Sequence, residues 1–383
     1  MNKYDVVIVG GSCAGAAAGY VLANAGKKVL ILDKAIFPRK KLCGGMITEK
    51  TITILKKVYD NIPLDIVINS KFSTFGIYHA EKGKICKYTS PSNKLYFVDR
   101  AIFDEYFLKR AESIGCTVYM GQKVTVIKEN SIITESGEEI SADYILGADG
   151  SHSIVHKSGF AEKEKRNSAI AFEVDVTYED LKCFNDNDGI FPKIYFGFIN
   201  DGYGWVFPKK EFATVGLGGL IHSNKNIRNL FMVFLKNIVK QNLDYLSLKI
   251  SGFPIPFHNL IEKPALKSKL LLGDAAGLID PITGEGIYFA ILSGKLAAEA
   301  ILANGDSASN YNNLIKINIR KYLNQAYFVK YFLFHPKFNR YAMFKMKNNA
   351  KYCKYYFDLL SGDIDFIQYA RRILKDRKKY KSE

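Results

Sequence analysis

The feature that most constrains this chain is a glycine-rich turn between two short apolar runs near its amino terminus. Residues 4–9 are rich in β-branched side chains, as in a buried parallel strand, and residues 28–33 form a second such run that ends in an acid. Between them lie the turn, residues 10–15, and an alanine-rich helical stretch, residues 16–24. This order predicts a βαβ unit, and therefore a parallel sheet at the start of the chain.

The turn has the spacing of a dinucleotide-binding loop, with Ser12 at the position where the common GxGxxG pattern has its middle glycine. Gly10 would make the tight turn, and the amino terminus of the helix would offer N–H groups and a positive dipole to a pyrophosphate. Asp33 follows Gly10 by 23 residues and would bond the ribose hydroxyls. We expect a bound dinucleotide here; a strand–helix turn without a ligand is the alternative.

Two later segments show a buried strand followed by an acid and small residues. Residues 143–155 contain Gly-Ala-Asp-Gly, and residues 269–287 contain Gly-Asp-Ala-Ala-Gly followed by a glycine-punctuated turn into a helix over 288–302. In this order the three motifs resemble the nucleotide-binding boxes of the para-hydroxybenzoate-hydroxylase-like flavoproteins. The resemblance runs from residue 4 to about residue 300 and implies FAD as the cofactor.

The same resemblance implies which residues contact FAD. Asp274 would hold the ribityl chain and pyrophosphate region, while the amides of Gly286 and Ile287 would lie near the isoalloxazine. Asp149 would support the FAD site and any encounter with a pyridine nucleotide. The predicted cofactor-binding residues are Gly10, Ser12, Ala14, Gly15, Asp33, Lys34, Arg39, Cys43, Gly44, Gly45, Arg100, Val124, Asp149, Asp274, Gly284, Gly286 and Ile287, with no metal ligand.

Two of these residues have ordinary structural alternatives. Arg100 precedes an expected helix, and the resemblance implies that it contacts FAD; the alternative is a solvated surface arginine. Val124 lies on a strand that would bring backbone groups to the adenine; the alternative is ordinary strand packing. The chain has no second GxGxxG motif and no redox-active cysteine pair, which argues against reductases of the glutathione-reductase type.

Three segments resemble the geranylgeranyl reductase family more narrowly. Residues 37–45 resemble its FPRxKxCGG segment, residues 203–208 its YxWxFP signature, and residues 356–362 its late helix and turn. The full signature begins with a proline three residues before the tyrosine, where this chain has Asn200. Together, these segments extend the resemblance over most of the chain.

The candidate catalytic residues are Cys43, Tyr203 and Trp205. Tyr203, Trp205 and Phe207 alternate along an expected strand, so their side chains would share one face. The resemblance implies that this face lines an apolar cavity beside the flavin; an ordinary aromatic sheet core is the alternative. Cys43 is expected near the flavin ring, with a small buried thiol as the alternative. Tyr203, Cys43 and an ordered water are all candidate proton donors.

The implied function is reduction of carbon–carbon double bonds in isoprenoid chains, such as geranylgeranyl groups of lipids or quinone tails, by hydride from reduced flavin. The electron donor would be external: NAD(P)H, a ferredoxin or a deazaflavin. An aromatic or polyketide monooxygenase or a halogenase is the alternative, although Tyr203 and Phe207 depart from the WxWxIP segment of halogenases. A membrane-attached flavin-binding protein without turnover is a third possibility.

The motif order predicts an α/β and α+β fold with three parts. A Rossmann-like FAD-binding domain would comprise residues 1–69, 97–160 and 262–304. An inserted antiparallel-sheet substrate domain with one covered face would comprise residues 70–96 and 161–261, where short apolar and polar runs alternate. Residues 305–383 would form a basic, aromatic-rich helical segment.

The net charge of +16 is concentrated in the carboxyl-terminal part of the chain. Residues 311–383 hold 17 Lys and Arg against 5 Asp and Glu, a local net charge of 17 − 5 = +12. Tyr and Phe are interleaved with these bases, which suits an anionic membrane surface. A solvated helical cap is the alternative. Nucleic acid is not expected as a partner, because no nucleic-acid motif accompanies the charge.

Cysteine spacing and hydropathy suggest the cellular location of the chain. The six cysteines are scattered without a CxxC pair, which is poor material for a disulfide framework, a zinc site or an iron–sulfur cluster. No apolar run approaches the roughly 20 residues of a spanning helix, and no signal peptide is evident. We therefore expect a cytoplasmic chain, with peripheral contact at the inner face of the membrane.

Overall fold

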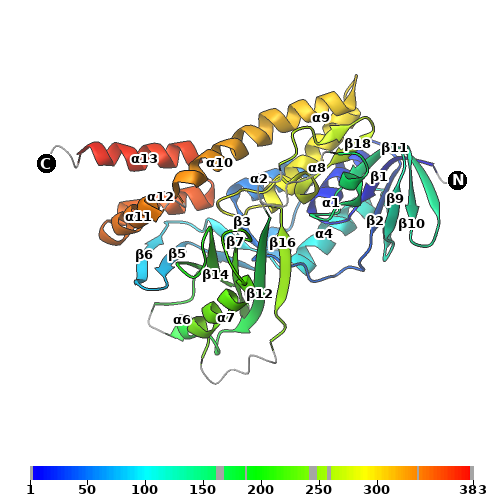
Figure 1. Ribbon diagram of the computed structural model, residues 1–383. Coiled ribbons are helices and arrows are strands. Elements are labelled where there is room, and N and C mark those ends of the chain that lie inside the picture. The colour runs from blue at the N-terminus through cyan, green and yellow to red at the C-terminus, as the bar shows by residue number, and fades with distance from the viewer. Residues whose placement is uncertain are drawn as a thin grey trace.

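The computed structural model describes residues 3–160, 168–185, 188–240, 248–256, 260–333 and 336–379 (Figure 1). It confirms the predicted fold class: a Rossmann-like sheet, a second sheet of mainly antiparallel strands, and helices at the carboxyl-terminal end. In Figure 1 the first sheet lies to the right, the second below the centre and the final three helices to the left. The division into domains at particular residues stays a prediction.

The first sheet contains the predicted βαβ unit. β1 (Lys3–Val9) pairs in parallel with β2 (Val29–Asp33) on one side and β11 (Glu139–Gly147) on the other, and α1 (Cys13–Asn24) connects β1 to β2. Five further strands complete the sheet: β8 (Thr117–Met120), β9 (Val124–Ile127), β10 (Ser131–Thr134), β17 (Ala265–Leu266) and β18 (Lys269–Leu271). Since β1, β2, β11 and β18 are parallel, the motifs that follow them meet at one edge of the sheet.

Small residues let the helices pack closely against this sheet. A Cβ on Gly19 of α1 would stand 2.7 Å from the Ile31 side chain, and one on Gly294 of α8 (Ile287–Leu302) would overlap the backbone of α1. α4 (Arg100–Ser113) contributes Leu108 beside the glycine turn. The other helical elements before the last helices are α2 (Glu49–Val58), α3 (Leu64–Val67), α5 (Ile154–Lys157), α6 (Lys182–Asn185), α7 (Ile227–Ile238) and a 3₁₀ turn (Gly273–Ala276).

The second sheet departs from the sequence expectation in two respects. Its strands, in spatial order, are β16 (Ser251–Ile255), β12 (Ala169–Thr177), β15 (Phe212–Leu220), β14 (Gly202–Pro208), β13 (Lys193–Phe196), β5 (Thr74–His79) and β6 (Gly83–Thr89). The β13–β5 pair is parallel, so the sheet is mixed. Both faces are covered: α7 packs Phe231 on one, while Trp205 on the other belongs to a core shared with the last helices. Alternation along single strands could not reveal cover supplied by such distant helices.

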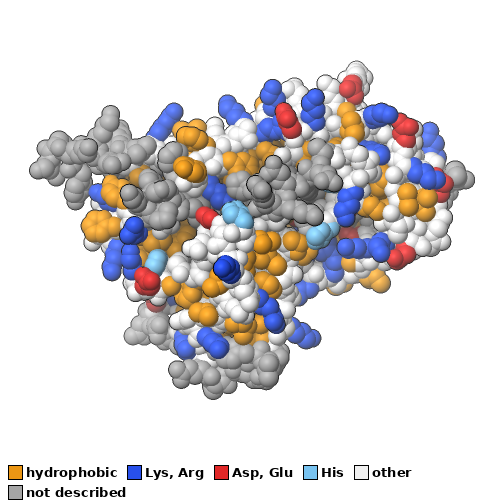
Figure 2. Space-filling view, viewed as in Figure 1, with side chains coloured by type: hydrophobic (Ala, Val, Ile, Leu, Met, Phe, Trp, Pro, Cys, Tyr) orange, Lys and Arg blue, Asp and Glu red, His pale blue; other side chains and the backbone are white. Residues whose placement is uncertain are grey.

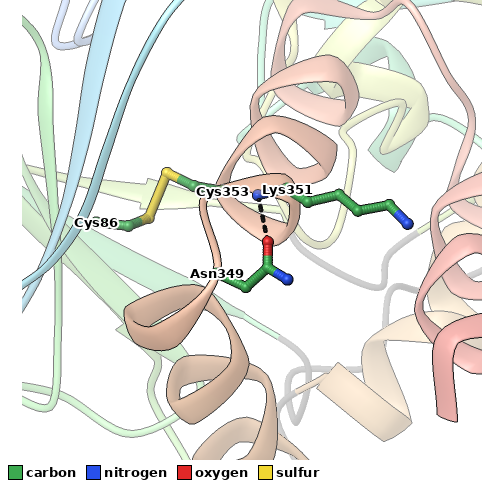
Figure 3. Close-up of a disulfide and its surroundings, with 4 residues drawn as sticks. All are labelled: Cys86, Asn349, Lys351 and Cys353. Carbon is green, nitrogen blue, oxygen red and sulfur yellow. Dashed lines mark hydrogen bonds between the residues drawn. A yellow bond between two sulfur atoms is a disulfide. The ribbon is translucent and has the colours of Figure 1, made fainter. Parts of the chain in front are cut away.

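A small third sheet and the last helices complete the fold. β3 (Met46–Thr48), β7 (Leu95–Phe97) and β4 (Ser70–Phe72) form an antiparallel sheet. The predicted carboxyl-terminal helices are α9 (Ser307–Ile315), α10 (Lys321–Leu333), α11 (Pro336–Asn348), α12 (Ala350–Ser361) and α13 (Phe366–Lys379). Asn349 caps α12 by accepting from the Lys351 N–H at 3.0 Å (Figure 3), and Gly362 ends it in a left-handed conformation. No described helix is long and apolar enough to cross a membrane.

One disulfide joins α12 to the second sheet (Figure 3). Cys353 of α12 is fully buried and bonds Cys86 of β6, with Cα atoms 6.1 Å apart. The expectation that scattered cysteines would form no disulfide framework missed this bond. The two residues are separated by 267 positions, so their spacing in the sequence carried no signal.

Candidate active site

A cavity of about 210 Å³ lies where the two larger sheets and the last helices meet. The glycine turn contributes Ser12 and Cys13 to its lining, and the segment before α8 contributes Asp274 and Gly286. Its other walls come from the loop over residues 41–45, from β14 and from α12. The cavity therefore connects the predicted dinucleotide-binding residues with the predicted substrate-facing aromatic residues.

The glycine turn is tight because neighbouring backbone leaves no room for side chains. Gly10 has a left-handed backbone (φ 106°), and a Cβ there would overlap the carbonyl of Ala148. A Cβ on Gly15 would overlap the carbonyl of Gly10. Ser12 turns its hydroxyl away from the turn, donating to Asp104 at 2.7 Å. The serine in place of the middle glycine is therefore anchored to α4, and its side chain does not cap the N–H groups of α1.

Asp33 is buried at the end of β2 and fixes the same turn. Its carboxylate accepts from the N–H of Gly11 and from the N–H of Ala35, both at 2.9 Å. Arg39 lies 3.9 Å from Asp33 and also 3.9 Å from Asp104, with its guanidinium over the ring of Phe37. Lys34 is exposed beside them. The contact of Asp33 with a ribose stays a prediction.

Arg100 is a buried residue, which excludes the solvated surface alternative. Its guanidinium pairs with Asp104 one turn later on α4, through two contacts of 2.8 Å, and donates to Ser12 at 3.1 Å. Burial opposes ionisation of Asp104, but Arg100 outweighs it and lowers the pKa of that carboxyl to about 2. Arg100 also lines the cavity, so the pair fastens α4 to the glycine turn at the cavity wall.

The later motifs divide between the cavity and its surroundings. Asp274, Gly284, Gly286 and Ile287 line the cavity, and Ile287 begins α8. Asp149 does not line it; its carboxylate accepts from the N–H of Ile154 at 2.6 Å, and burial raises its pKa. The other carboxylate oxygen of Asp149 has no hydrogen-bond partner in the described parts of the chain. Val124 is buried on β9 outside the cavity lining, so its role toward adenine stays a prediction.

A glycine on β15 makes room for the central ring of an aromatic row on β14. Tyr203 lies opposite Gly218 and Trp205 lies opposite Gly216, where a Cβ would overlap the indole ring. Tyr203, Trp205 and Phe207 all line the cavity, with successive ring centroids 5.9 and 6.2 Å apart. The Tyr203 hydroxyl donates to the carbonyl of Thr283, and burial raises its pKa. This side chain therefore keeps its proton and directs it at a carbonyl.

Cys43 lies in the loop that faces this row. Its half-buried side chain lines the cavity, and its sulfur accepts from the N–H of Gly45 at 3.4 Å. Two buried residues hold the same loop: Glu173 of β12 accepts from the N–H of Cys43, and Lys209, directly after β14, donates to the carbonyl of Gly44. Neither was predicted, because each contacts the loop across more than 100 positions of the sequence.

Comparison with known proteins identifies the family. Residues 3–196 match the model of an FAD binding domain. The chain is 30% identical to the digeranylgeranylglycerophospholipid reductase of Methanococcus aeolicus over 327 residues, covering 80% of this chain and 79% of the relative. It is also 30% identical to the chloroplastic geranylgeranyl diphosphate reductase of Arabidopsis thaliana, over 84% of this chain and 70% of the relative.

The chain belongs to the geranylgeranyl reductase family. Its fold matches the crystal structure of a geranylgeranyl bacteriochlorophyll reductase-like protein from Thermoplasma acidophilum, with a TM-score of 0.76 and 22% identity. That match covers 91% of this chain and 92% of the other.

FAD is the cofactor of this geranylgeranyl reductase family member, and the residues present fit it. Gly10 and Gly15 allow the tight turn that leads into the amino terminus of α1, where a pyrophosphate is favoured by the helix dipole. Gly44, Gly45, Gly284 and Gly286 expose backbone along the cavity, as the approach of a flat ring system requires. The predicted contacts of individual residues with FAD stay predictions.

A second, partly buried charge pair in the cavity wall was not predicted from the sequence of this geranylgeranyl reductase family member. Lys50 of α2 pairs with Glu285, and the rings of Tyr288, Phe289 and Tyr322 surround its ammonium group. Burial lowers the pKa of Lys50, but Glu285 outweighs burial and the net shift is upward. The partners are 235 positions apart, and the glycines on either side of Glu285 were the only local signal.

Proposed function

We propose that the chain is an FAD-dependent reductase that saturates carbon–carbon double bonds of isoprenoid chains, such as geranylgeranyl groups of lipids or quinone tails. The observation that carries this proposal is the continuity of one cavity, from the glycine turn to the aromatic row Tyr203, Trp205 and Phe207. Relatives named for geranylgeranyl substrates support it. Reduced FAD supplies the hydride when bound.

The residues of this chain would position the alkene and exclude water. An unactivated double bond offers no carbonyl to polarise, so precise placement in a dry cavity should supply most of the catalysis. The aromatic row offers apolar surface for a prenyl chain. The Phe207 ring packs against the Phe97 ring, with centroids 5.2 Å apart. We propose that Gly44, Gly284 and Gly286 admit the reacting part of the cofactor beside this wall.

We propose Cys43 rather than Tyr203 as the side chain that supplies the proton. The Cys43 thiol lines the cavity and is half-buried. The Tyr203 hydroxyl is engaged with the carbonyl of Thr283, and its raised pKa makes it a weak acid. Trp205 would line the cavity without a proton-transfer role, because an indole N–H is not acidic enough to take part.

A product assay tests the proposal. The protein is reduced with dithionite, so that no biological electron donor is needed, and incubated with geranylgeranyl lipids. Mass spectrometry should then show gains of two hydrogens per reduced double bond. Incorporation of oxygen or halide would instead indicate the monooxygenase or halogenase alternative, and an unchanged lipid would indicate a binding protein. The natural donor, whether NAD(P)H, ferredoxin or deazaflavin, can be sought once turnover is established.

We further propose that the last helices contact anionic membranes, from which a water-insoluble substrate would enter. Phe328, Tyr331 and Phe344 on α10 and α11 are exposed to 64–75%, an unusual exposure for aromatic side chains. Figure 2 shows many Lys and Arg side chains and fewer Asp and Glu on one face of the molecule. Each base near such a surface contributes about 1 kcal/mol of attraction.

Vesicle sedimentation tests this contact. The sequence points to Arg371, Arg372, Lys375, Arg377, Lys378 and Lys379, but the side chains of residues 374–379 lie outside the described set, and Arg372 pairs with Asp358. The variant therefore neutralises the exposed bases Lys316, Lys321, Lys347 and Arg371, and its matched control neutralises Lys27, Lys56, Lys57 and Lys225. Only the variant with changes in the last helices should lose binding to phosphatidylserine vesicles. Added salt should weaken the binding of the parent protein to the same vesicles. Equal vesicle binding by both variants and the parent would refute the proposed contact between the last helices and anionic membranes.

A further inference from the structure

Glu173 is a buried carboxyl group with an incomplete set of hydrogen bonds. It lies on β12 opposite Gly216, which in turn lies opposite Trp205, so it belongs to the strand positions that face the Cys43 loop. Its side chain is 3% exposed and accepts from the N–H of Cys43 at 2.8 Å. Its second oxygen has no hydrogen-bond partner among the residues that the structure describes. Buried carboxylates are usually paired or multiply hydrogen-bonded, so this one needs an explanation.

Lys209 holds the same loop from the other side. It directly follows β14 and is 4% exposed, and its ammonium group donates to the carbonyls of Gly44 and Val98 at 2.6 and 2.8 Å. A Cβ on Gly45 would overlap that ammonium group. An acidic and a basic side chain therefore hydrogen-bond to the same dipeptide: Glu173 to the N–H of Cys43 and Lys209 to the carbonyl of Gly44.

Both groups exchange protons near neutral pH. Burial raises the pKa of Glu173 to about 7, and the nearby Asp175 adds to the shift. Burial lowers the pKa of Lys209 to about 8, against the attraction of Cys43, Glu173, Asp99 and Asp175. Lys40 also acts on Glu173 and is itself paired with Asp175 at 2.6 Å. Arg100 and Tyr203 also interact electrostatically with Cys43.

We propose that Glu173 and Lys209 are positioning residues that hold Cys43 at the cavity wall and set the electrostatic field at its thiol. The Lys209 ammonium stabilises the thiolate that remains when the thiol S–H bond gives its proton to a substrate carbon, and solvent protons later restore the thiol. The ionised Glu173 carboxylate opposes the thiolate. This inference deepens the proposed function and rests on it only for the identity of the proton acceptor.

Alkylation of Cys43 by iodoacetamide measures the field without any substrate. Peptide mass mapping separates Cys43 from Cys13 and Cys116, which are buried, and from Cys183. Lys209→Met should slow alkylation of Cys43 at pH 7.5 severalfold, because it removes a positive charge that interacts favourably with a negative charge on Cys43. Lys209→Arg, which keeps the charge, should restore most of the rate.

Glu173→Gln is nearly isosteric and should act in the opposite sense. Above pH 7 it removes a negative charge at the Cys43 N–H and should raise the alkylation rate, and an inflection near pH 7 that we expect in the parent should be absent from the variant. Glu179→Gln is the control, because Glu179 lies just beyond the end of the same strand and is exposed. FAD content and circular dichroism verify that each variant is folded.

The inference is overturned if folded Lys209→Met and Glu173→Gln proteins alkylate Cys43 within twofold of the parent from pH 5.5 to 9. Should Lys209→Met fail to fold, the Glu173→Gln profile alone decides. Failure of the proposed function looks different: alkylation then changes as stated while no prenyl lipid is reduced.

Discussion

The space beside Trp205 depends on one missing side chain. Gly216 lies directly opposite it on β15, and any Cβ there would overlap the indole ring. A Cβ on Gly218, two residues on, would meet the Ala171 methyl group at 3.1 Å, and no aromatic ring is among its three nearest contacts. The two glycines look alike in the sequence, yet only one of them is required by the aromatic row.

Gly216→Ala should therefore displace Trp205, whereas Gly218→Ala should disturb it little. Trp205 is the only tryptophan of the chain, so its fluorescence reports on the cavity wall without labelling. We expect a shifted emission maximum and at least tenfold lower reductase activity in Gly216→Ala, with FAD retained. Identical spectra for Gly216→Ala and the parent would show that the overlap is relieved elsewhere.

The buried carboxyl of Glu173 should also appear in the pH dependence of folding. Its pKa rises from 4.5 to about 7 on folding, so the native state holds more protons than the unfolded chain between these values. The free energy of unfolding should then fall as pH rises through this window, by up to about 3 kcal/mol. Urea unfolding from pH 4.5 to 7.5 measures this slope, and Glu173→Gln should flatten it. An unchanged slope in Glu173→Gln would show that another group causes it.

At the scale of single elements, α4 carries two ion pairs with different surroundings. Arg100 and Asp104 are buried against the glycine turn, whereas Glu105 and Lys109 form a pair of the same spacing, 2.6 Å apart, with the Lys109 side chain 61% exposed. Since loss of either Arg100 or Asp104 leaves a buried charge unpaired, disrupting this pair should destabilise the fold far more than disrupting the exposed pair. Surface pairs contribute less than about 1 kcal/mol.

Arg100→Met should therefore lower the free energy of unfolding by about 3–5 kcal/mol and reduce FAD retention during gel filtration. Glu105→Gln on the same helix should change the stability by less than about 0.5 kcal/mol and leave FAD retention intact. If Arg100→Met unfolds at the same denaturant concentration as Glu105→Gln, the network at the turn does not anchor α4.

Elements were predictable where their signal is local. The βαβ unit, the turn at Gly10 and the helix α8 follow from periodicity and glycine spacing within about 30 residues. The hydrogen bonds of Glu173 and Lys209 to the Cys43 loop were not predictable, because they join residues that are 130 and 165 positions apart. The parallel β13–β5 pair was missed for the same reason. Contacts between distant strands or between layers of the fold produce no local pattern in a single sequence, so they could not be predicted from it.

At the scale of the whole molecule, the last helices close the cavity and are tied to the second sheet. Tyr356 and Leu360 of α12 line the cavity, and the Phe357 ring packs at a tilt against Tyr88 of β6 with ring centroids 5.1 Å apart. The Cys86–Cys353 bond joins the same two elements. The cavity wall contributed by α12 therefore depends on both apolar packing and a covalent link.

Cys353→Ser should lower the free energy of unfolding, typically by about 2–4 kcal/mol, because the bond closes a long loop of the unfolded chain. Guanidinium unfolding measures the change, and reduction of the parent protein should reproduce it. Cys183→Ser removes a cysteine that is not part of the disulfide and serves as the control. A Cys353→Ser protein as stable as the Cys183→Ser protein would mean that packing alone holds α12.

The central claim is that reduced flavin in this cavity transfers its electrons to an isoprenoid double bond. The most direct test mixes the dithionite-free, photoreduced protein with a geranylgeranyl lipid under strict exclusion of oxygen and follows flavin absorption. We predict that the oxidised flavin spectrum returns, with one double bond lost per flavin reoxidised. A flavin that stays reduced until oxygen is admitted would contradict the account and point to a monooxygenase.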